Sequence, residues 1–116
     1  MNNSFPKSAR ILKKSHFQHL MRASSKFKSP HLLIHYRLGF TKCSKLGLSV
    51  SKKYGKAHDR VFFKRLFREV FRLNRSRLPH NIELNVFPIK STETVSYHDL
   101  QTDFLFFIDF LNRTHP

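Results

Sequence analysis

The chain has 116 residues, enough for one domain around a single hydrophobic core, so residues 1–116 are expected to form one domain. Its 22 lysines and arginines outnumber seven acids and give a net charge of +15, while the single cysteine excludes an internal disulfide. The longest apolar run, residues 104–108, is too short to span a bilayer, and residues 1–22 lack the apolar stretch of a secretory signal. A protein of the cytoplasm without a membrane partner is therefore expected.

The positive charge is concentrated in the first two thirds of the chain. Residues 1–80 hold 20 of the 22 basic residues against two acids, for a charge of +18, whereas residues 81–116 carry −3. Such asymmetry indicates a polyanionic partner bound by the first part. A membrane surface is the rival polyanion, but its binding usually needs an exposed apolar face beside the charges.

The first part of the chain predicts one short helix and three strands. After a loose tail at residues 1–4, a capping box of Ser15 and Gln18 predicts a helix over about 16–23. A very short edge strand is expected at 26–28, and stronger strands at 31–37 and 46–51. In the second strand Leu33 and His35 lie on the face opposite the more apolar positions.

A long helix with two opposed faces follows, with Asp59 as its expected N-cap and Pro79 ending it or its trailing turn. At roughly 100° per residue, its cations fall within an arc of about 140°. They are Arg60, Lys64, Arg65, Arg68 and Arg72. Like charges four residues apart destabilise an isolated helix, so an RNA or DNA backbone is expected to compensate them. The alternative is an ordinary solvated face.

The opposite arc of this helix is apolar and is expected to face the core. It contains Phe62, Phe63, Leu66, Phe67, Val70 and Leu73. Val61 falls in the middle of the basic arc, which predicts that it is exposed or pressed against RNA. Phe62 lies at the margin of the apolar arc, which predicts that it is half buried.

The last third predicts one more strand and one more helix. Residues 82–86 alternate and Pro88 closes the strand, while Ser96 and Asp99 form a capping box for a helix over about 97–111. Its core stripe is Leu100, Phe104, Phe107, Ile108 and Leu111. This acidic helix is assigned to packing. The order is αβββαβα, and the strands on either side of the long helix are expected to be parallel neighbours in one sheet.

No protein active site emerges from the sequence. His16 and His19 have no acid near them in sequence, so no metal site is expected, and the first 80 residues lack the paired carboxylates of a two-metal nuclease. The loop at 51–60 does not match a P-loop, and nothing pairs Cys43 with a histidine. RNA-binding chemistry remains, with basic residues on phosphates and Phe17 and His35 as candidates for stacking on unpaired bases.

Three segments in order, FPKSARILKKSHFQHLM, SPHLLIHY and LGLSVSKKYGKAHDR…KRLFREVFR, resemble the protein subunit of bacterial ribonuclease P over about residues 5–90. The resemblance implies an α+β sandwich with a four-stranded sheet and a left-handed β-α-β crossover. It implies no catalytic residue in the protein, because the catalytic RNA subunit, with bound Mg²⁺, removes the 5′ leader of precursor tRNA. The implied partners are that RNA, in 1:1 ratio, and precursor tRNA.

The resemblance also implies site residues. Those expected to bind RNA are Lys52, Lys53, Lys56, Arg60, Lys64, Arg65, Arg68 and Arg72. Those expected in a cleft for the leader are Phe17, Met21, Leu33, His35, Lys64 and Arg68. The chain departs from the family where an Arg-Asn-Arg motif reads Arg60-Val61-Phe62, at Met21, where an aromatic is usual, and at His35, where tyrosine is usual.

Three alternatives stay open at this point. A ribosome-associated or other non-catalytic RNA-binding protein would share the charge pattern. A degenerate member of the family would share the fold but dock RNA more weakly. An autonomous nuclease is disfavoured by the shortage of acids.

Overall fold

The computed structural model describes residues 24–38, 43–89 and 95–115. In chain order its elements are β1 (Ser25–Lys28), β2 (Leu32–Leu38), β3 (Lys45–Leu48), α2 (Ala57–Asn74), the 3₁₀ turn η2 (Arg75–Arg77), β4 (Ile82–Pro88) and α3 (Tyr97–Thr114). These agree with the predicted order and type of elements. The predicted first helix, with Phe17 and Met21, lies outside the described residues.

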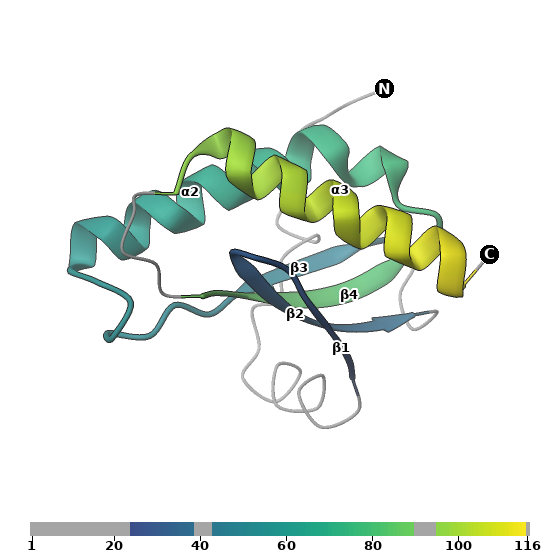
Figure 1. Cartoon of the computed structure of the whole chain (residues 1–116), viewed down its shortest axis with the longest axis horizontal. Helices are drawn as coiled ribbons and strands as arrows, with labels where there is room; N and C mark the ends of the chain where they lie inside the picture. Colours follow the sequence, from purple (N-terminus) through teal and green to yellow (C-terminus); the bar gives the residue numbers. More distant parts are fainter. Residues whose placement is uncertain (1–23, 39–42, 90–94, 116) are drawn as a thin grey trace.

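The four strands form one mixed sheet in the order β1-β2-β4-β3. β2 runs antiparallel to β1 and β4, whereas β3 runs parallel to β4. Both α2 and α3 cover the same face of the sheet (Figure 1). The predicted α+β architecture and the parallel pairing across the long helix are therefore confirmed.

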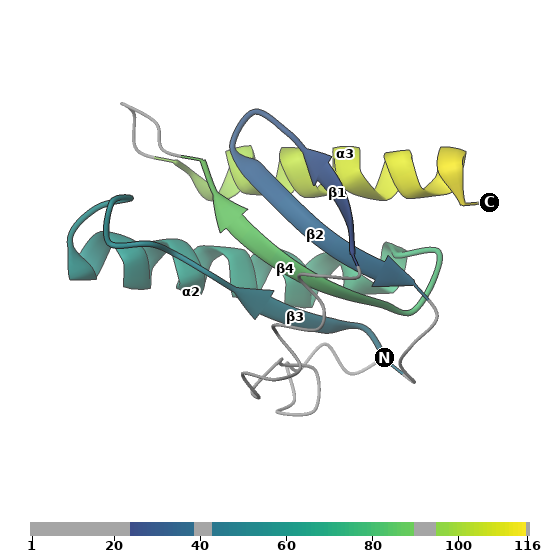
Figure 2. The same cartoon turned by 90° about the horizontal axis from the view of Figure 1, so that it is seen from below.

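The connection from β3 through α2 to β4 is left-handed. In Figure 2 the sheet lies in front of the helices, and β3 and β4 point the same way. When these strands are turned to point upward, β4 lies to the right of β3 while α2 passes behind the sheet. That path is the reverse of the right-handed crossover found in nearly all β-α-β units.

The core lies between the sheet and the two helices. Alternate residues of the central strands point into it, as predicted: Leu32, Ile34 and Tyr36 from β2 and Ile82, Leu84 and Val86 from β4. All five predicted core residues of α3 are buried. Between the helices Phe67 and Phe71 of α2 meet Phe104 of α3, at 5.6 Å and 6.1 Å between ring centroids. Phe63 stacks on Phe67 at 6.3 Å. We call these four rings the aromatic seam.

The seam shows that the predicted centre of the apolar face of α2 was wrong. Phe71, assigned to neither arc, is 0% exposed, whereas Leu73, placed in the apolar arc, is 42% exposed. The buried face is turned by about 60° toward the cations. The larger aromatic ring of Phe71 packs against Phe104, which leaves Leu73 at the solvent side. Val61 is exposed, as predicted, and Phe62 is about half exposed.

The start of α2 also differs from the prediction. The N-cap is Lys56, and Asp59 lies at the third helical position, where its Oδ2 accepts a hydrogen bond of 3.1 Å from the backbone N–H of Lys56. A carboxylate there satisfies an N–H that the helix leaves unpaired. Gly55 makes room for it, because a Cβ at that position would lie 2.9 Å from Asp59 Oδ2.

Boundaries shift by a few residues elsewhere. β3 ends at Leu48 and not at Ser51, although Ser49 N still donates to Val86 O at 3.0 Å. α3 begins at the predicted Ser96–Asp99 capping box and continues three residues beyond the predicted end.

We predict that Phe71→Ala and Leu73→Ala differ sharply in their effect on stability. Phe71→Ala removes a fully buried ring from the seam and should cost about 3–5 kcal/mol of unfolding free energy. Leu73→Ala, at a largely exposed position, should cost less than about 1 kcal/mol. Urea unfolding of both variants measures the difference. Equal losses would contradict the observed rotation of α2.

Candidate nucleic-acid interface

The loop before α2 presents three exposed lysines beside the helix start. Lys52, Lys53 and Lys56 are all exposed. The turn is closed by a hydrogen bond of 3.1 Å from Tyr54 N to Ser51 O, and the Tyr54 ring packs on Phe63 at 5.7 Å between centroids. The lysines are thus carried on a loop that is anchored to the core at the first turns of α2.

The cations of α2 run alongside the aromatic seam. Lys64, Arg68 and Arg72 each follow one phenylalanine of the seam, so burial of the rings determines the side of the helix on which these cations lie. Arg65 and Arg68 are exposed, whereas the other three cations are partly buried. We call the combined set the basic face: Lys52, Lys53, Lys56, Arg60, Lys64, Arg65, Arg68 and Arg72.

The positions of Arg60 and Arg72 limit how freely these two members of the basic face can contact a ligand. Arg60 lies at the border of the core, where its Nε is buried and has no hydrogen-bond partner. Arg72 Nε donates to Glu69 Oε2 at 3.1 Å, and this hydrogen bond holds the pKa of the Glu69 carboxyl below its ordinary value. The charge of Arg72 is therefore already partly compensated within the protein.

The sheet face turned away from the helices forms a second surface, which we call the sheet floor. Its residues are Lys26, Lys28, Leu33, His35, Arg37, Lys45, Gly47, Glu83, Asn85 and Phe87. His35 is buried, with its ring 5.1 Å from that of Phe87 and its Nδ1 3.3 Å from Ser24 Oγ. Leu33 and His35 thus lie together on the face that the sequence predicted.

Burial lowers the pKa of His35 from its ordinary value of 6.5, and the positive charge of Lys26 lowers it further. Lys26 is its direct neighbour across the β1–β2 pairing. Both effects disfavour the charged form of the imidazole. The ring is also only 5% exposed, so it presents little surface to a base.

Sequence reasoning missed three polar residues of the sheet floor. Arg37 Nη2 pairs with the buried carboxylate of Glu83 at 3.0 Å. Asn85 is fully buried, and its Nδ2 donates to Ser49 Oγ at 3.2 Å while its Oδ1 is buried without a hydrogen-bond partner. The alternation over residues 82–86 places Glu83 and Asn85 on the face opposite the core, which agrees with the structure. The alternation does not indicate that both side chains are buried there.

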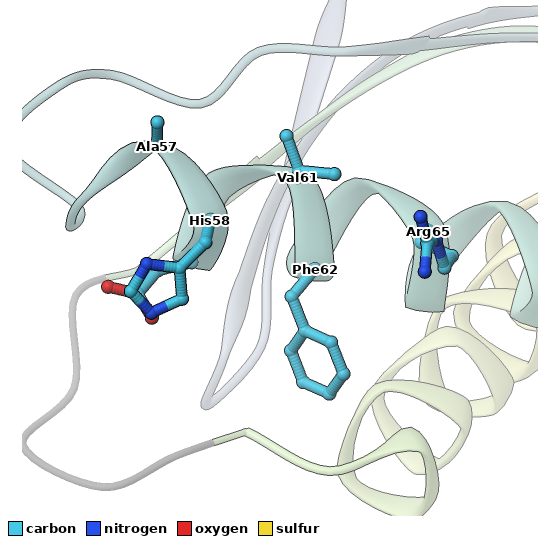
Figure 3. A pocket seen from close by; sticks show the side chains of 6 residues that line it. Ala57, His58, Val61, Phe62 and Arg65 are labelled. Carbon is cyan, nitrogen blue, oxygen red and sulfur yellow. The ribbon is translucent and has the colours of Figure 1, made fainter.

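The basic face and the sheet floor lie on opposite sides of the sheet, and the edge at β3 separates them. α2 runs behind β3 in Figure 2. In Figure 3 Phe62 projects from α2 toward the side of α3, whereas Val61 projects the opposite way, toward β3. Lys64 and Arg68 share the Val61 side of the wheel. They are therefore placed at the β3 edge and not on the floor beside Leu33 and His35.

Among the described residues, no group of three or more histidine, cysteine, aspartate or glutamate side chains could hold a metal ion. Within the same residues, no helix is long and apolar enough to cross a membrane.

Comparison with known proteins decides the family. The Ribonuclease P family model matches residues 5–111. The chain belongs to the ribonuclease P protein family. It is 40% identical over 103 residues to the ribonuclease P protein component of Chlamydia caviae, covering 88% of this chain and 73% of the relative. For the component of Desulforapulum autotrophicum the identity is 34% over 101 residues, with 86% of each chain covered.

Solved structures agree with this assignment. The RNase P protein of Thermotoga maritima superposes with a TM-score of 0.77 at 25% identity and covers 92% of this chain and 98% of that one. A mutant RNase P protein of Staphylococcus aureus gives a TM-score of 0.80 at 22% identity, over 91% of this chain and 90% of that chain, which supports the fold.

The chain therefore serves as a ribonuclease P protein component in processing the 5′ end of tRNA. Membership of this family implies association with the ribonuclease P RNA and with its tRNA substrate. Ribonuclease P is a ribonucleoprotein, which accounts for a basic protein whose sequence offers no paired carboxylates or nucleophile of its own.

We predict that His35 makes stability fall as the pH is lowered. The unfolded chain takes up a proton at the ordinary histidine pKa near 6.5, but folded His35 takes it up only at lower pH, so unfolding is favoured below that value. His35→Tyr, which cannot accept this proton, should lose less melting temperature between about pH 7.5 and about pH 5.5 than the unaltered protein. His98→Tyr, at an exposed position of α3, is the control. An identical pH profile for His35→Tyr and the unaltered protein would contradict the assignment.

Proposed function

We propose that the basic face binds the catalytic RNA subunit of ribonuclease P. The observation that carries the proposal is the fixed rotation of α2, which holds a row of cations at the β3 edge beside three exposed lysines. Among the residues of that helix, only Asp59 and Glu69 are acidic, and each already pairs with a group of the protein. A chain of phosphates offers the anions that this surface lacks, and binding would release counterions from the RNA.

The single-stranded leader of precursor tRNA is assigned to the sheet floor. Leu33 and the buried His35 form part of this face, and Lys64 and Arg68 contribute from the β3 edge. The family resemblance adds Phe17 and Met21 to the same cleft. An extended strand of nucleotides needs aromatic or flat groups for its bases and cations along its backbone. The floor and the adjoining edge of the basic face offer these two kinds of group next to each other.

The metal chemistry is assigned to the RNA. Mg²⁺ prefers oxygen ligands such as carboxylates. The basic face consists of lysines and arginines and contains no carboxylate. A 1:1 complex in the cytoplasm, with Mg²⁺ bound by the RNA, completes the proposed assembly.

The decisive experiment is cleavage of precursor tRNA at low Mg²⁺ by the cognate RNA alone, by the protein alone and by both together. The expected result is slow cleavage by the RNA, none by the protein, and a marked acceleration by the mixture. Cleavage by the protein alone would identify an autonomous nuclease. An RNA rate unchanged by the protein would identify a degenerate member of the family or a binding protein with another role.

Removal of two basic-face cations tests the phosphate contacts. We expect Lys64→Ala combined with Arg68→Ala to lower the slope of log K against log[salt] by roughly 1–2 units, because each lost phosphate contact removes about 0.7–0.9. Filter binding to the catalytic RNA over a salt series measures the slope. Arg113→Ala, which removes an exposed cation from α3, should leave it unchanged. A slope unaltered in the double variant would show that these side chains do not meet phosphates.

A further inference from the structure

An apolar hollow interrupts the outward face of α2. It has a volume of about 550 Å³ and is lined by Ala57, His58, Asp59, Val61, Phe62 and Arg65. Figure 3 shows Val61 and Phe62 projecting to opposite sides of the helix, with Arg65 one turn further along. Val61 is 54% exposed and Phe62 is 49% exposed, at positions that point away from the core. The outward face of a surface helix is ordinarily polar, so exposed apolar side chains in this hollow indicate a binding surface.

We propose that Phe62 stacks on an unpaired nucleobase of the bound RNA, with the adjoining phosphate held by Arg65. This inference rests on the proposed function, because it places a base beside the basic face, with Arg65 as the cation that belongs to both the basic face and the hollow. It also gives a chemical role to the family's Arg-Asn-Arg position, where this chain has Val61 and Phe62.

The surroundings of Phe62 favour a base over other occupants. A second copy of the chain would bring together two surfaces of a protein with net charge +15. The apolar surface that Ala57, Val61 and Phe62 expose is also far smaller than the area that a stable dimer buries. A nucleobase matches the area of a single phenylalanine ring and arrives with the anionic group that the neighbouring cations require.

The carboxylate of Asp59, the acidic residue that lines the hollow, lies away from the position proposed for the phosphate. Asp59 Oδ2 accepts the hydrogen bond from Lys56 N at 3.1 Å, and its Oδ1 lies 3.1 Å from His58 Nε2. Asp59 is therefore engaged at the start of the helix, one turn from Phe62. Arg65 lies at the other end of the hollow, which directs the phosphate to that end.

The chain contains no tryptophan, so a single introduced tryptophan reports on the site without background. Phe62→Trp should bind the catalytic RNA within about threefold of the unaltered protein, and stacking should quench its emission. Phe106→Trp is the matched control, because Phe106 is 54% exposed on acidic α3, and its emission should not change. Equal quenching in both variants would overturn the proposal.

Truncation gives an independent test. Phe62→Ala and Phe62→Leu should each weaken binding to the catalytic RNA by about 5- to 150-fold, while the salt slope stays unchanged because no phosphate contact is lost. Phe106→Ala should bind normally, and melting curves of the free variants check that the fold is intact. Full affinity in Phe62→Leu would overturn stacking, and a dimer dissolved by Phe62→Ala in sedimentation would identify a second copy as the occupant. If the unaltered protein itself fails to bind the RNA, the proposed function fails; if it binds and the Phe62 variants bind equally well, only the stacking inference fails.

Discussion

Burial of the aromatic seam determines how α2 presents its charges. Phe63, Phe67 and Phe71 are spaced four residues apart and are all buried, with Phe67 and Phe71 packed on Phe104, so rotation of the helix would expose at least one of these rings. The cations Lys64, Arg68 and Arg72 follow the rings by one residue and are carried to the β3 edge as a consequence. The protein uses hydrophobic packing, which salt does not weaken, to position a surface that acts by electrostatics, which salt does.

The left-handed crossover gives this helix its place relative to the sheet floor. Because α2 and α3 occupy one face, the opposite face of β2 and β4 is left to Leu33, His35 and Asn85. α2 runs behind the edge of the sheet that β3 forms, so the helix and the floor lie on opposite sides of the same edge.

The sequence predicted the elements well because alternation and capping act over a few residues. The capping box of Ser96 and Asp99 and the alternation in β2 both appear where they were expected. The rotation of α2 was missed because Phe71 and Leu73 are equally apolar, and only their packing against α3 distinguishes them. Crossover handedness is likewise a property of the whole sheet, and it came from family resemblance alone. The buried state of Asn85 and Glu83 depends on what covers the floor, which no local pattern contains.

For the same reason the sequence predicts which residues belong to the candidate site but not which of them are free to contact a ligand. The eight cations of the basic face remain predicted RNA-binding residues, and the structure shows that they differ: Arg72 donates to Glu69 and Arg60 has a buried Nε. Arg72 must release Glu69 and Arg60 must move out from the border of the core before either can reach a phosphate, whereas Arg65 and Lys56 are already exposed. Like charges along α2 repel one another in the free protein, so an RNA backbone that neutralises them also relieves strain on the helix. On the proposed function, RNA binding and the stability of α2 are coupled, and packing of the seam has to hold the helix in place in the free protein.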